Sequence, residues 1–130
     1  MKNRAAVFQR RHYRVPFDCP VEFQILQYRR RNINHLSSKR GPACGHDLGE
    51  DGLSFISDYL LPVDMIIRVT FQLPDCGEQT VLARVVRSVP AGTGYLTAIQ
   101  FLNFDGPRKD RLRLYITRET RKNYKFLKYL

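Results

Sequence analysis

The sequence predicts a mainly β domain, an antiparallel barrel or sandwich, that ends in an α-helix. Several short segments alternate apolar and polar residues with the period of a half-buried strand. Turn-forming residues separate these segments, and the apolar spacing changes to that of a helix only near the C-terminus. A length of 130 residues suits one domain with one core, so we expect residues 1–130 to form a single unit.

The N-terminal third contains one clear strand between two polar segments. Residues 1–14 are basic and lack periodicity, so we expect a flexible, exposed arm. Val21, Phe23 and Ile25 alternate with polar residues and predict the first strand. The following residues 29–45 are rich in Arg, Asn, Ser and Gly, and they predict a loop or the irregular end of a hairpin.

Four further strands complete a β region that we expect to span residues 15–104. The first covers residues 52–57, and the second, at residues 67–73, alternates strictly. The third, at residues 81–86, is apolar on one face and carries Leu82, Arg84 and Val86 on the other, which predicts a strand partly covered on both faces. The fourth covers residues 95–101. Turn signals separate the later strands at Pro74-Asp75-Cys76-Gly77 and Ala91-Gly92-Thr93-Gly94.

The C-terminal residues 105–130 have the spacing of a helix. Pro107 suits a first helical turn, and Leu112, Tyr115 and Ile116 then fall on one face. We expect this face to pack against the β region. Other positions are mostly basic, and the apolar stripe extends through Tyr124, Leu127 and Leu130.

Charge and composition limit the classes of function. The formal net charge is +10, which favours anionic ligands and partners. No segment is apolar enough to span a bilayer, the N-terminus is a poor signal peptide, and three scattered cysteines do not suggest a disulfide framework. We therefore expect a cytoplasmic protein. No metal-ligand spacing, Ser-His-Asp set or phosphate-binding glycine loop stands out, so we expect no metal, no cofactor and no enzymatic activity.

Two short motifs each precede a predicted strand. Arg10-Arg11-His12-Tyr13-Arg14 precedes a strand that opens with Val15, and Asp47-Leu48-Gly49-Glu50-Asp51-Gly52 leads into the strand at residues 52–57. Together they resemble the signature of the PilZ family, which is RxxxR before the first strand and D/N-x-S-x-x-G before a later one. The second motif is degenerate, because Gly49 stands at the serine position.

This resemblance implies a six-stranded antiparallel β-barrel with a C-terminal helix, and a receptor for cyclic di-GMP. It implies that the ligand-binding residues are Arg10, Arg11, Arg14, Asp47, Gly49 and Gly52. Arginine donors fit phosphate oxygens and the guanine O6/N7 edge, and a carboxylate accepts from guanine N–H groups. The arm would order over the ligand, and the protein, a monomer or weak dimer, would signal through a protein partner in motility, polysaccharide or virulence control.

Two other functions stay open. A PilZ-like chain that has lost the nucleotide would act only as a protein-interaction module, and Gly49 and Asp51 favour this reading because one lacks a hydroxyl and the other would repel phosphate. A small basic barrel that binds nucleic acid is the third reading. We expect it least, because the strands lack exposed aromatic residues interleaved with Lys and Arg.

Overall fold

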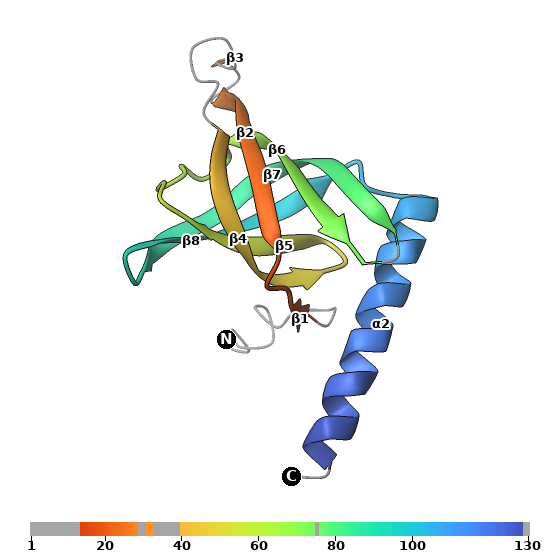
Figure 1. Cartoon of the computed structure of the whole chain (residues 1–130). Coiled ribbons are helices and arrows are strands. Elements are labelled where there is room, and N and C mark those ends of the chain that lie inside the picture. Colours follow the sequence, from red (N-terminus) through yellow and green to blue (C-terminus); the bar gives the residue numbers. More distant parts are fainter. Residues whose placement is uncertain (1–13, 29–30, 33–39, 75, 129–130) are drawn as a thin grey trace, which may run out of the picture.

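The structure is a computed structural model that describes residues 14–28, 31–32, 40–74 and 76–128. Side chains are described within these ranges except at residues 31–32, 40–42 and 123–128. Figure 1 shows a β structure with one long helix beside it. The elements are β1 (Arg14–Pro16), β2 (Pro20–Tyr28), β3 (Arg31–Asn32), β4 (Arg40–Gly49), β5 (Gly52–Ser57), β6 (Ile66–Leu73), β7 (Gly77–Ala91), β8 (Gly94–Leu102) and α2 (Pro107–Lys128).

Six strands close a ring of hydrogen bonds in the order β4, β5, β8, β7, β6 and β2, since β2 also pairs with β4. Every pairing is antiparallel, and closure leaves no free edge among these six strands. The short strands β1 and β3 add to β4 and β2 respectively. The predicted six-stranded antiparallel barrel with a C-terminal helix is therefore confirmed.

Alternate side chains of each strand point into the barrel, and those of neighbouring strands form apolar rows there. Leu48, Leu53 and Ile99 are paired across β4, β5 and β8, and all three are buried. Four phenylalanines fill much of the remaining interior, namely Phe17, Phe23, Phe55 and Phe71. At one end the first half of α2 joins the same cluster through Leu112 and Ile116, as its spacing predicts.

The sequence prediction of a loop or an irregular hairpin end over residues 29–45 is wrong from Arg40 onward, because β4 begins there. Within the same range, the short strand β3 pairs with the end of β2. The first residues of β4 are poor strand formers, but β4 pairs with β2 and then β1 along one edge and with β5 along the other, and these pairings override local propensity. Gly45 shows how closely the chains approach: a Cβ there would lie 2.4 Å from the carbonyl oxygen of Phe17.

The prediction that β7 is partly covered on both faces is also wrong. Val81, Ala83 and Val85 are buried, but their neighbours Leu82 and Val86 are exposed by 39% and 51%. Burial in β7 alternates with period 2 from Gln79 to Val86, and this alternation ends at the irregularity between Val85 and Arg87.

Candidate functional site

Three strands bring the central side chains of the candidate site together on the outer wall of the barrel. Asp47 of β4 is directly opposite Pro16 of β1 on one side and Ser54 of β5 on the other. Arg14 lies two residues before Pro16, and residues two apart in a strand share a face. Arg14, Asp47 and Ser54 therefore point the same way, and we call these three residues the Asp47 cluster.

The Asp47 cluster converges on a single oxygen. Arg14 Nη1 donates to Asp47 Oδ1 at 2.8 Å, and Ser54 Oγ donates to the same oxygen at 2.9 Å. The side chains of Arg14 and Asp47 are 20% and 21% exposed, and Ser54 is buried. These two bonds fix the orientation of the carboxylate, and neither uses Asp47 Oδ2 or the Nη2 edge of the guanidinium.

The two glycines of the second motif have different surroundings. Gly49 is buried in β4, directly opposite Arg14 of β1, so it lies beside the Asp47 cluster. Gly52 faces β8 instead: a Cβ there would lie 1.9 Å from the carbonyl oxygen of Ile99. Gly52 is therefore required for the close approach of β5 to β8, a structural role.

The acidic residues between these glycines contact the C-terminal helix. Arg113 Nε donates to Glu50 Oε1 at 2.9 Å, and this hydrogen bond, with the Coulombic attraction of Glu50, raises the pKa of Arg113. Lys109 Nζ lies 3.6 Å from Asp51 Oδ1. Since Lys109 and Arg113 are one helical turn apart, the β4–β5 turn is held to one face of α2.

An open hollow of about 380 Å³ lies on the outer wall of the barrel beside the Asp47 cluster, at Ile56, two residues after Ser54 in β5. Cys44 and Ile56, which are paired across β4 and β5, line it together with residues of the β7–β8 hairpin. Ile56 is 39% exposed. The Asp47 cluster is thus flanked by an exposed surface with apolar character that could accept a flat ring.

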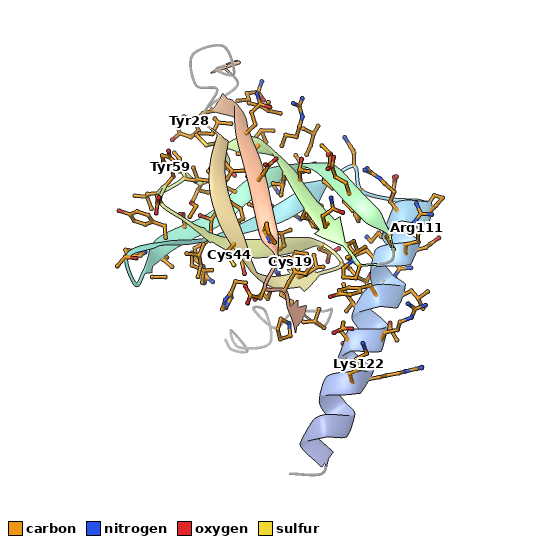
Figure 2. The ribbon with its side chains drawn as sticks, viewed as in Figure 1. Cys19, Tyr28, Cys44, Tyr59, Arg111 and Lys122 are labelled. Atoms are coloured by element: carbon orange, nitrogen blue, oxygen red, sulfur yellow. The ribbon has the colours of Figure 1, made fainter. Side chains whose placement is uncertain are left out.

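Cys44 and Cys19, both labelled in Figure 2, lie near Asp18. Cys44 Sγ donates to Asp18 Oδ1 at 3.0 Å; this bond is the main cause of a raised pKa of Cys44. Burial, followed by the charge of Asp18, raises the pKa of Cys19. Both thiols are therefore held in the protonated form. No group of three or more potential metal ligands occurs within the described part of the chain.

Residues 8–118 match the PilZ domain. The chain belongs to the PilZ domain family. A search among curated proteins finds no match.

Solved PilZ structures share the fold. The PilZ domain of YcgR from Escherichia coli, solved with cyclic di-GMP, superposes with a TM-score of 0.61 at 15% identity, over 94% of this chain and 99% of that one. MotI/DgrA, the inhibitor of motility of Bacillus subtilis, gives 0.71 at 12% identity, over 94% of this chain but 57% of that one. The PilZ domain of CeSA from a cellulose-synthesizing bacterium gives 0.57 at 20% identity, over 82% and 98%.

The structure describes four of the six residues that the PilZ resemblance assigns to the ligand. Arg14, Asp47 and Gly49 lie together, whereas Gly52 faces the barrel wall at Ile99. The other two, Arg10 and Arg11, lie outside the described residues.

Ser54 is the member of the Asp47 cluster that sequence reasoning missed. Its position in the alternating strand predicts an outward side chain between buried Leu53 and Phe55. Its pairing with Asp47, however, depends on an irregularity in β4 between Gly45 and Asp47, which shifts the register by one residue.

Within the described part of the chain, no helix is both long enough and apolar enough to cross a bilayer. The long helix α2 is rich in charged residues instead.

Proposed function

We propose that this PilZ protein is a receptor for cyclic di-GMP that signals through a protein partner and has no catalytic role. The single observation that carries the proposal is the Asp47 cluster, in which Arg14 and Ser54 hold one oxygen of the carboxylate. The family membership and the cyclic di-GMP found in the related YcgR domain supply its context.

The cluster offers the chemistry that a guanine nucleotide requires. The Oδ2 of Asp47 can accept from guanine N1–H and N2–H₂, groups that a phosphate lacks and adenine does not present in this pattern. The guanidinium of Arg14 has further donors for phosphate oxygens or for the guanine O6/N7 edge. In this proposal Arg10 and Arg11 add charge for the two phosphates, and the hollow beside Cys44 and Ile56 accepts a base.

The acidic residue that most threatens phosphate binding has a charge partner elsewhere. Asp51 is directed to Lys109 of α2, at 3.6 Å, so a cation compensates its carboxylate. This placement favours the receptor over a chain that has lost its ligand.

Gly49 is the one feature of the site that favours a protein-interaction module without nucleotide. It supplies no hydroxyl at a position beside Arg14 and Asp47. Loss of one neutral hydrogen bond costs about 0.5–1.5 kcal/mol, which weakens binding about three- to tenfold. A defect of that size lowers affinity without removing it.

The test is a calorimetric titration with cyclic di-GMP, with GTP and cyclic GMP as comparison ligands. We expect cyclic di-GMP to bind far more tightly, and Arg14→Ala or Asp47→Ala to weaken it about 10- to 150-fold, the range for hydrogen bonds to charged groups. Arg68→Ala is the matched control, because Arg68 is an exposed cation of β6 whose hydrogen bond is to Gln24. If millimolar cyclic di-GMP produced no heat and no NMR shifts, the protein-interaction module would be left as the function.

A further inference from the structure

The helix α2 carries most of the net positive charge of the protein. Its 22 residues contain nine Lys and Arg and two Asp and Glu, a net charge of +7 out of +10 for the chain. At about 1.5 Å per residue the helix is about 33 Å long. It contacts the barrel mainly at β1 and β4, and Arg108 also donates to the backbone oxygen of Thr80 in β7 at 3.0 Å. Figure 1 shows its C-terminal half extending past the barrel.

The outward face of α2 is basic with one apolar residue within it. Leu112 and Ile116 are buried against the barrel, whereas Arg111, Leu114, Arg118 and Arg121 are exposed on the opposite side. We call these four residues the outward face of α2. Their spacing of three and four residues aligns them along the helix, and Leu114 is 52% exposed. Figure 2 shows the nearby Lys122 extending into solvent.

The acidic residues of α2 do not neutralise this face. Asp110 pairs with Arg113 at 3.7 Å, and Glu119 pairs with Lys122 at 3.1 Å. Within the described part of the chain, no ion pair involves the three arginines of the outward face. Their charges are therefore available to an external group.

The composition of this face suits a protein partner. Arginine is enriched in protein interfaces and lysine is depleted, and this face presents three arginines around an exposed leucine. A carboxylate can accept two parallel hydrogen bonds from one arginine guanidinium. The exposed leucine favours an apolar contact, which a phosphate backbone does not supply. Insertion into a membrane requires a broad apolar face, which this side of α2 lacks.

The same helix is tied to the candidate ligand site. Glu50 and Asp51, which lie between Asp47 and Ser54 in the chain, hold Arg113 and Lys109 of α2. The strand β1, which carries Arg14, also contacts α2. A change in the β4–β5 turn or in β1 would therefore act directly on the position of the helix.

We propose that the outward face of α2 is a docking surface for a protein partner whose carboxylates pair with its arginines, and that Glu50 and Asp51 couple this surface to the ligand site. The coupling, unlike the docking, rests on the proposed cyclic di-GMP function. Two measurements separate them, since docking can be measured without nucleotide.

Docking is tested with a fluorescently labelled peptide of alternating glutamate and leucine residues, titrated with the full chain. The docking variant is Arg118→Glu with Arg121→Glu. The control is Arg68→Glu with Arg84→Glu, which changes the net charge equally on the barrel wall, where both arginines are exposed. We expect the docking variant to lose about tenfold or more in peptide affinity and the control less than about threefold.

Three results would overturn the docking surface. Equal losses in the two variants would mean that only bulk charge matters. Tighter binding of duplex DNA than of the peptide would indicate a nucleic-acid surface. Tighter binding of phosphatidylglycerol vesicles would indicate a membrane surface.

The coupling is tested by repeating the peptide titration with saturating cyclic di-GMP. We expect a change of about threefold or more in peptide affinity for the wild-type chain, and no change in a Glu50→Gln, Asp51→Asn variant that still binds the nucleotide. Nucleotide binding without any change in peptide affinity would refute the coupling. An absence of nucleotide binding would refute the proposed function, and with it the coupling, while the docking result would stand.

Discussion

The convergence of two donors on Asp47 Oδ1 can be tested without any ligand, by double-mutant cycles. The changes are Arg14→Ala, Ser54→Ala and Asp47→Ala, with the two double variants that include Asp47→Ala. Each cycle isolates one contact of the carboxylate, the ion pair at 2.8 Å or the hydroxyl bond at 2.9 Å.

The structure predicts that the neutral hydroxyl contributes at least as much as the charged guanidinium. Arg14 and Asp47 are each about one-fifth exposed, so their ion pair is partly screened and should couple by about 0.5–1 kcal/mol. Ser54 is buried and donates to a carboxylate, for which coupling of about 1–2 kcal/mol is expected. At about 1 M salt the Debye length falls to about 3 Å, so the first coupling should weaken more than the second.

Urea denaturation of the variants and the wild type gives both coupling energies. Unchanged m-values would confirm that the folded states stay comparable. A Ser54–Asp47 coupling below about 0.3 kcal/mol, the error of additivity for independent sites, would refute the view that Ser54 positions the carboxylate.

Three further predictions concern single residues. Gly52→Ala should lower the free energy of unfolding by about 3 kcal/mol or more, since the new Cβ would meet the backbone oxygen of Ile99 at 1.9 Å; thermal denaturation measures it. Gly49→Ser should raise affinity for cyclic di-GMP about three- to tenfold in calorimetry, if one missing hydroxyl is the defect. Asp18→Asn should lower the pKa of Cys44 and so speed its alkylation at mildly alkaline pH, because the thiol would lose the carboxylate that stabilises its protonated form.

Each of these predictions has a control or an opposing result. Gly92→Ala controls for Gly52→Ala: Gly92 has φ of 61° with no atom near the new Cβ, so only backbone strain of about 1–2 kcal/mol is expected. Binding that improves only when Asp51→Gly is added to Gly49→Ser would indicate a site with several defects. An unchanged alkylation rate in Asp18→Asn would contradict the hydrogen bond to Cys44.

Sequence reasoning predicts the elements whose periodicity is local. β6 alternates Ile67, Val69 and Phe71 with polar residues, and the helix places Leu112 and Ile116 on one face, so both are confirmed. β4 is different, since its stability comes from pairing with strands distant in the sequence. No local pattern in residues 40–45 reveals those pairings.

The same distinction holds at the site. The motif predicts Arg14 and Asp47, and the structure joins them by an ion pair. Ser54 could not be assigned, because its contact with Asp47 depends on a register shift in β4. Gly52 resembles a ligand residue in the motif, but the proximity of the Ile99 carbonyl explains why a glycine is required there.

The acidic pair of the second motif bears on the choice between a working and a lapsed receptor. In the sequence, Asp51 suggests repulsion of a phosphate, and Glu50 has no evident role. In the structure both carboxylates face cations of α2, at 3.6 Å and 2.9 Å. The departure that remains beside the Asp47 cluster is Gly49, and one missing hydroxyl corresponds to a three- to tenfold loss of affinity, about 0.5–1.5 kcal/mol. In the receptor proposed above, a defect of that size lowers affinity without removing it, and Arg14 and Ser54 hold one oxygen of the carboxylate so that the other is left for a ligand.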